Sequence, residues 1–230
     1  MQTGRRAARP WLVLVVSPCD ILRGTTLKEA LSSHAIDLVQ LRHNPTTPFS
    51  NDNFVEAMAA LSALGPTMGD RPPHYVVNAP SGLVHPDDSP ATHLDGWHYP
   101  ERHLDNLLQP TARQSGSIFG VSVHSVAAAN KAVAAGASYV QVGTMFPTAS
   151  HPEKSVIEGP GLVREVRRMH PSVRLIGIGG ITEGNCVEVL QAGADGVAVI
   201  RAILDSTEPA RAAQQLRTAL DAFHNSEHER

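Results

Sequence analysis

Ser122 and His124 are the residues whose types and spacing best suit proton transfer. They lie two positions apart in the segment GVSVHS, residues 120–125. Side chains two apart in a strand point to the same face, so both are expected at one site. A histidine placed there can move protons near neutral pH. The alternative is a structural histidine bonded to a neighbouring strand or helix end. We take His124 as the candidate catalytic residue.

Two other segments end in groups suited to a phosphate, Gly179-Gly180 in RLIGIGGIT and Ile200-Arg201 in AGADGVAVIRAI. Glycine lets the backbone approach a phosphate closely and present its N–H groups. The alternatives are a tight turn for the glycines and a solvent-facing side chain for Arg201. The backbone N–H groups of residues 200 and 201 are therefore better phosphate ligands than the arginine side chain. These segments predict a site for a small phosphorylated ligand.

Gln40 and Arg42 form a second pair on one strand face, in the segment VQLRHN. An arginine there can hold a carboxylate or a phosphate through two parallel hydrogen bonds. The alternative is an arginine that is ion-paired within the protein. Both residues are candidates for binding the ligand.

Eight apolar runs rich in Val and Ile alternate with segments of helical spacing. Most of these runs end abruptly in polar or small residues, as buried parallel strands do. The predicted strands are 11–16, 37–42, 75–78, 96–98, 118–123, 139–142, 174–177 and 196–199, and the predicted helices include 53–64, 126–135, 183–192 and 209–223. Eight such units predict an α/β fold, a single (β/α)8 TIM barrel with its site at the carboxyl ends of the strands. A doubly wound open sheet is the alternative.

The composition favours one domain over residues 1–230, with 1–9 and 224–230 as flexible ends. A net charge of −3 argues against nucleic acid as a partner. Cys19 and Cys186 have no metal or redox spacing, which predicts reduced thiols in a cytoplasmic protein. The apolar run 11–16 is too short to span a bilayer, so no membrane partner is expected.

Five segments resemble the thiamine phosphate synthase and TenI superfamily. They are VQLRHN, GVSVHS, VGTMFPTASHP, GIGGIT and AGADGVAVIRAI, in the order of that superfamily and extending from residue 39 to residue 203. The resemblance implies a (β/α)8 barrel and a role in cytosolic vitamin B1 metabolism. It also implies a phosphate site at Gly180, Ile200 and the neighbouring backbone, with Ser122 and Thr148 lining the ligand pocket.

The chain departs from the synthase pattern where that pattern has charged residues. The synthase joins a pyrimidine diphosphate to a thiazole phosphate and needs Mg²⁺ for the diphosphate. Its lysine and aspartate positions are occupied here by Asn44, by Ala79-Pro80 after Asn78, by His103 and by His151. Mg²⁺ prefers hard oxygen ligands, and a diphosphate needs cationic partners. The resemblance with these departures argues against synthase activity, and we expect no metal and no cofactor.

The remaining pattern resembles the TenI-type thiazole tautomerase, which aromatises a thiazole carboxylate phosphate by shifting one proton. His124 would move the proton, the glycine segments would hold the phosphate, and Arg42 with Gln40 would hold the carboxylate. Two alternatives stay open: a synthase with substituted metal ligands, and a non-catalytic protein that binds thiazole phosphate or thiamine phosphate. Barrels of this kind often pair, so a homo-oligomer is also left open.

Overall fold

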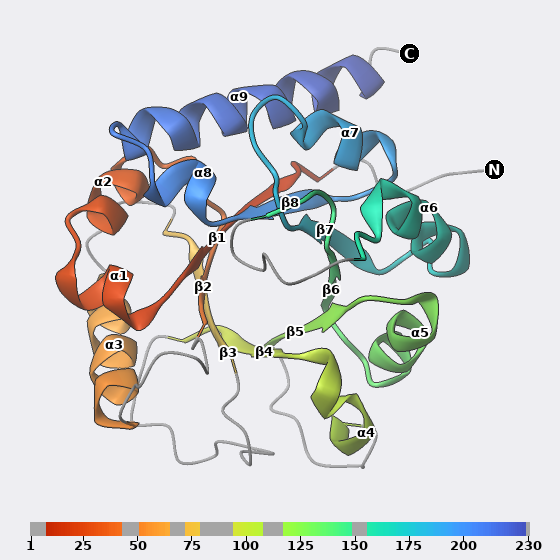
Figure 1. Ribbon diagram of the computed structural model, residues 1–230, viewed down its shortest axis with the longest axis horizontal. Coiled ribbons are helices and arrows are strands. Elements are labelled where there is room, and N and C mark those ends of the chain that lie inside the picture. The colour runs from red at the N-terminus through yellow and green to blue at the C-terminus, as the bar shows by residue number, and fades with distance from the viewer. Residues whose placement is uncertain are drawn as a thin grey trace.

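The protein, in this computed structural model, is described over residues 8–42, 51–64, 72–78, 94–107, 117–148 and 156–228. Eight strands of this part pair in parallel in chain order, and the last pairs with the first (Figure 1). They are β1 (Trp11–Val16), β2 (Leu38–Leu41), β3 (His74–Asn78), β4 (Gly96–Tyr99), β5 (Ile118–Val123), β6 (Tyr139–Gly143), β7 (Arg174–Ile178) and β8 (Gly196–Val199). This closed barrel confirms the predicted fold and excludes the open sheet, which would have two free edges.

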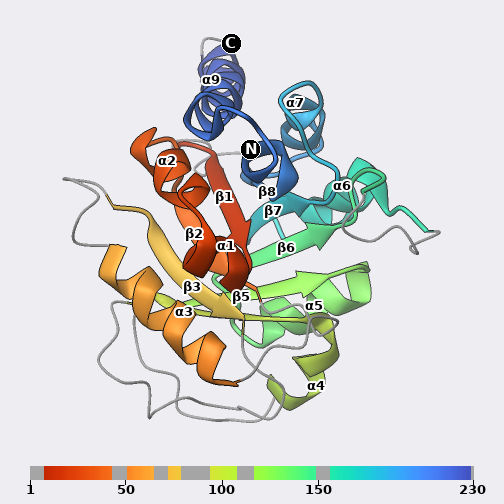
Figure 2. The same ribbon diagram turned by 60° about the vertical axis from the view of Figure 1, so that its left-hand side comes forward.

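Helices surround the barrel, with α9, α7 and α2 covering the side of β8 and β1 (Figure 2). The helices are α1 (Pro18–Arg23), α2 (Thr26–Ser32), α3 (Asn51–Leu64), η2 (Glu101–His103), α4 (Leu104–Leu107), α5 (Val126–Ala134), α6 (Gly159–Met169), α7 (Cys186–Gln191), α8 (Arg201–Leu204) and α9 (Pro209–His228). The helix predicted over 209–223 extends in the structure to residue 228, as α9. The predicted helix 183–192 begins only at residue 186, because Asn185 Oδ1 accepts the Thr182 N–H and holds a turn there. In the described ranges, no helix has the length and apolar character that a membrane span requires.

Strand side chains alternate between the barrel interior and the surrounding helices. The interior cluster consists of Val13, Val15, Leu38, Val76, Tyr139, Ile176 and Ala198. Their neighbours along the strands, such as Leu12, Leu14 and Val39, belong to the larger cluster that includes the helices. Both strand faces are buried, which explains why the strands appear as continuous apolar runs in the sequence.

Gly120 makes room for one large ring inside the barrel. It lies opposite Tyr139 in the pairing of β5 with β6. A Cβ atom at position 120 would lie 2.2 Å from Cζ of the Tyr139 ring. Trp11 packs edge-on against the same ring, with the centroids 6.0 Å apart. The glycine in the middle of this strand is thus required by its bulky neighbour.

Four residues that precede β2, β4, β6 and β8 each bind one residue of the preceding strand twice. The side chain accepts the backbone N–H of that residue, and the backbone N–H donates to its carbonyl oxygen. The pairs are Asp37 with Leu12, Asp95 with Tyr75, Ser138 with Phe119, and Asp195 with Leu175. The four side-chain contacts measure 2.7–3.0 Å. These double contacts fix the register of four strand pairs at the amino end of the barrel.

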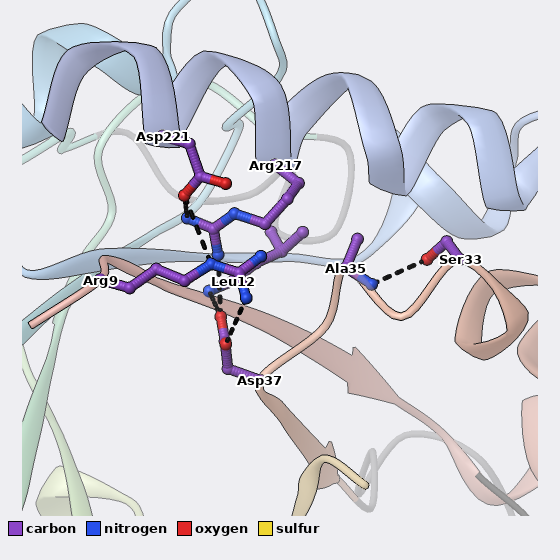
Figure 3. A network of polar contacts seen from close by, with 7 residues as sticks. All are labelled: Arg9, Leu12, Ser33, Ala35, Asp37, Arg217 and Asp221. Carbon is purple, nitrogen blue, oxygen red and sulfur yellow. Dashed lines mark hydrogen bonds and ion pairs between the residues drawn. The ribbon is translucent and has the colours of Figure 1, made fainter. Parts of the chain in front are cut away.

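Arg217 connects α9 to the first of these double contacts (Figure 3). Its side chain is only 2% exposed, and its Nη1 donates to Asp37 Oδ2 at 2.9 Å. Its Nη2 lies 2.8 Å from Asp221 Oδ1. Arg9 approaches the same carboxylates, at 3.3 Å from Asp221 and 3.9 Å from Asp37. The C-terminal helix is therefore held to β1 and β2 by a partly buried ionic network with Arg217 at its centre.

Replacing Arg217 by alanine should lower the free energy of unfolding by about 3 kcal/mol, because Asp37 would lose its buried partner. Urea unfolding followed by circular dichroism measures this loss. Arg211→Ala is the matched control, since Arg211 pairs with Glu208 in an i,i+3 contact with both side chains more than 60% exposed. The control should lose less than about 1 kcal/mol. Equal losses in the two variants would contradict the assigned role of Arg217.

Candidate active site

Amide side chains form a chain of hydrogen bonds at the carboxyl ends of three strands. Gln40 of β2 donates through Nε2 to Asn78 Oδ1 of β3 at 2.7 Å. Gln141 of β6 donates through Nε2 to Gln40 Oε1 at 2.9 Å. Gln40 and Gln141 are each about 1% exposed, so these bonds satisfy polar groups that water does not reach. Gln40 therefore joins the strand ends together, in addition to any contact with a ligand.

Gln141 was not among the residues singled out from the sequence. The sequence pattern could have indicated it, because Gln141 is a polar residue inside the otherwise apolar run YVQVG. Its partner could not be inferred, since the hydrogen bond to Gln40 joins residues 101 positions apart.

His98 of β4 is completely buried between Ser122 and Tyr139. Its Nε2 lies 2.7 Å from Ser122 Oγ, and its Nδ1 lies 2.9 Å from the Tyr139 hydroxyl. Burial, helped by the nearby positive charge of Arg42, lowers the pKa of His98 to about 3. His98 is therefore neutral at physiological pH and binds its two neighbours as an uncharged ring.

His124 lies just beyond β5 and contacts Glu101 instead of Ser122. Its ring Nδ1 and its backbone N–H each lie 2.7 Å from Glu101 Oε2. The His124 side chain is 48% exposed and that of Glu101 is 34% exposed. A carboxylate on Nδ1 favours the tautomer with a proton on that nitrogen, which leaves Nε2 as the base. Glu101 was not predicted from the sequence, because it belongs to a different strand end, in the short helix η2 after β4.

Arg42 follows β2 directly and is half-buried at the same end of the barrel. Its backbone N–H donates to the Val16 carbonyl at 2.8 Å, so the pairing of β1 with β2 fixes its position. Burial lowers the pKa of the Arg42 guanidinium. Its charge in turn lowers the pKa of His98. Arg42 thus supplies a positive charge close to the buried polar side chains.

Gly179 and Gly180 form a turn that only glycine adopts easily. Their φ angles are +105° and +63°, in the left-handed region. A Cβ on Gly180 would lie 2.4 Å from the Pro147 carbonyl oxygen and 2.7 Å from that of Phe146. The Gly179 carbonyl accepts the Phe146 N–H at 2.9 Å. The loop after β7 therefore lies directly against the loop after β6.

The remaining predicted ligand residues flank this turn or follow the next strand. Thr148 is half-buried in the loop after β6. Ile200 is half-buried and packs against the interior cluster, at the start of α8. Arg201 is exposed. The carboxyl ends of β7 and β8 thus bring the glycine turn and the backbone of residue 200 to the same side of the barrel.

Of the positions where the synthase pattern has metal-binding aspartates, the one described here is His103, which does not suit Mg²⁺. It offers an imidazole, whose pKa is lowered by burial and by Arg102. Asn78, which precedes the other such positions, has an amide oxygen that already accepts from Gln40. Across the described ranges, no group of three or more His, Cys, Asp or Glu side chains is placed to hold a metal ion. The corresponding residues Asn44, Ala79, Pro80 and His151 lie outside the described residues.

The fold and the site together define a (β/α)8-barrel protein. Its polar groups and glycine turn lie at the carboxyl ends of the strands, where barrel enzymes have their active sites. The family model described as thiamine monophosphate synthase matches residues 12–203, and the chain belongs to this TMP-TENI family.

Curated relatives are named thiamine-phosphate synthase. Thiamine-phosphate synthase of Geobacillus thermodenitrificans is 33% identical over 194 residues, which cover 84% of this chain and 83% of the relative. That of Bacillus velezensis is 43% identical over 121 residues, covering 53% of this chain and 54% of the relative. Among solved structures, thiamine phosphate pyrophosphorylase from Pyrococcus furiosus has a TM-score of 0.69 at 22% identity, covering 96% of this chain and 99% of that one. This last likeness concerns the fold alone.

Gly180→Ala should destabilise the protein by about 2 kcal/mol, because the left-handed conformation and two carbonyl oxygens both oppose a Cβ there. Urea unfolding measures the change. Gly161→Ala is the control, since no heavy atom lies within 4 Å of a Cβ at that position. A Gly180→Ala protein as stable as the control would show that the turn tolerates side chains.

Proposed function

We propose that this chain is an enzyme that binds a phosphorylated thiazole at the carboxyl end of its barrel, in the formation of thiamine phosphate. Membership of the family supports the substrate class. The glycine turn is the proposed phosphate end of the ligand, because residues in the left-handed conformation, such as Gly179 and Gly180, can present backbone N–H groups to an anion. The backbone N–H groups of Ile200 and Arg201 complete this proposed phosphate site.

The other proposed ligand contacts come from neighbouring strands. Ser122 and Thr148 line the pocket. Arg42 is the proposed partner of a ligand carboxylate, since it is a half-buried cation whose charge reaches His98 at this end of the barrel. Gln40 supports this end of the site by holding Asn78 and Gln141 in place.

The site geometry best supports a proton shift that aromatises a thiazole carboxylate phosphate. The contact between His124 and Glu101 is the observation on which this proposal depends. With Nδ1 facing the carboxylate, Nε2 of His124 accepts a proton from the non-aromatic ring, and the ring becomes aromatic as that proton is returned at another atom. One base, one phosphate anchor and one carboxylate anchor suffice for this reaction, which needs no cofactor.

Thiamine-phosphate synthase activity is the second candidate, and the names of the curated relatives favour it over the proton shift. The residues of this chain oppose it, because the position of one metal-binding aspartate is occupied by the imidazole of His103. The relatives and the residue chemistry thus favour different members of one family, and direct assays separate them.

We predict that the purified protein accelerates aromatisation of the non-aromatic thiazole carboxylate phosphate tautomer, followed by absorbance. His124→Ala should lose at least about 100-fold in rate, the usual contribution of a general base. Glu101→Gln should lose about tenfold, because it weakens the orientation of His124 without removing it. His170→Ala is the control and should keep full activity. His170 follows the last residue of α6 and contacts Asn130 of α5, away from the carboxyl ends of the strands.

A parallel assay supplies thiazole phosphate and the pyrimidine diphosphate, with Mg²⁺ or with chelator. Coupling that requires Mg²⁺, without acceleration of the proton shift, would establish the synthase and contradict the tautomerase proposal. If both assays are silent while thiazole phosphate binds, the chain is a ligand-binding protein without catalysis.

A further inference from the structure

The hydrogen bonds of His98 and Tyr139 determine how Ser122 can interact with a ligand. His98 lies between the two hydroxyl groups, with Nδ1 near Tyr139 and Nε2 near Ser122. A neutral imidazole has one N–H and one lone pair, so it donates to one hydroxyl and accepts from the other. The direction of this short relay depends on which hydroxyl donates to the ring.

Tyr139 is confined to donating. Its side chain is 0% exposed, and burial raises the pKa of its hydroxyl well above 10, so the group keeps its proton. Trp11 covers the ring edge-on and Gly120 lies opposite. Within the described ranges, His98 is the hydrogen-bonding partner of this hydroxyl. If the hydroxyl accepted from Nδ1 instead, its own O–H would stay buried without an acceptor, at a cost of about 1–3 kcal/mol.

The proton positions of His98 and Ser122 follow from this constraint. The Tyr139 O–H donates to Nδ1, so the single ring proton of neutral His98 lies on Nε2. That N–H donates to Ser122 Oγ, 2.7 Å away. Ser122 Oγ then accepts a hydrogen bond from His98 inside the barrel, and the Ser122 O–H is available to donate to a ligand.

We propose that Tyr139 and His98 act as positioning residues that make Ser122 a hydrogen-bond donor to the ligand. Ser122 is only half-buried and pairs with Gln141 at the carboxyl end of β5. Its O–H is therefore suited to a ligand group with a lone pair or a negative charge, such as a carboxylate, a phosphate or a ring nitrogen. The placement of the proton is independent of the proposed function, whereas its use on a phosphorylated thiazole rests on that function.

Long-range ¹H–¹⁵N NMR of the ligand-free protein, labelled at histidine, tests the proton placement. His98 is assigned as the signal absent from His98→Asn. The expected result is an Nε2–H tautomer whose signals do not titrate between pH 8 and pH 5, since its folded-state pKa is about 3. An Nδ1–H tautomer, or a ring that gains a charge in this range, would overturn the proposal.

Tyr139→Phe should remove the preference for this tautomer, so that signals of the Nδ1–H form appear for His98. Tyr75→Phe is the matched control, because the Tyr75 hydroxyl is buried with no hydrogen-bonding partner in the described part of the chain. The control should leave the His98 signals unchanged. If Tyr139→Phe also leaves them unchanged, Tyr139 does not set the tautomer and the proposal fails.

Calorimetry with thiazole phosphate tests the use of the donor. Ser122→Ala should weaken binding by on the order of tenfold, the usual value of one hydrogen bond in a binding site. Unchanged affinity together with the expected tautomer would refute the donor role of Ser122 alone. If the wild-type protein does not bind thiazole phosphate, the proposed function fails, while the NMR result still decides the proton placement.

Discussion

Strand register, fixed by four double contacts at the amino end of the barrel, is the constraint on which the rest of the structure depends. Asp37, Asp95, Ser138 and Asp195 each bind both backbone groups of one residue in the preceding strand. A slip of one residue would reverse the faces of a strand and expose its interior side chains to the helices. Because the register is set at the amino end, the polar residues at the carboxyl end have defined positions along the barrel axis and lie opposite their partners.

The barrel interior changes in character along its axis. Apolar residues such as Val13, Leu38 and Ile176 fill its centre, and the polar side chains lie toward the carboxyl ends of the strands. Two histidines at this end have opposite environments. His98 is fully buried and neutral, whereas His124 is half-exposed and contacts a carboxylate. Burial therefore keeps one imidazole neutral within the barrel, whereas the other lies partly exposed beside Glu101.

The barrel could be predicted from the sequence because each strand is a short apolar run with a polar or small residue near its end, and because both strand faces are buried. The glycine turn could also be located, since Gly179 and Gly180 follow such a run. Contacts between different strand ends could not be predicted. Ser122 and His124 are two positions apart and would share one face of a continuous strand. However, β5 ends at Val123, and His124 contacts Glu101 of η2.

Glu101, Tyr139 and Gln141 were missed for this same reason, because their partners are distant in sequence. Tyr139 begins an apolar strand, and only its pairing with Gly120 and its contact with His98 show its role. Glu101 followed a strand end in a segment read for its metal-binding pattern, where it was not an expected ligand. The chemistry of the site thus arises from pairings that local patterns do not contain.

Amide chemical shifts measured while thiazole phosphate is added to ¹⁵N-labelled protein show whether the phosphate is bound at the glycine turn. We expect the largest changes at the backbone N–H groups of Gly180 and Ile200, with smaller changes at Ser122. Changes confined to the amino end of the barrel, or none at saturating ligand, would contradict it.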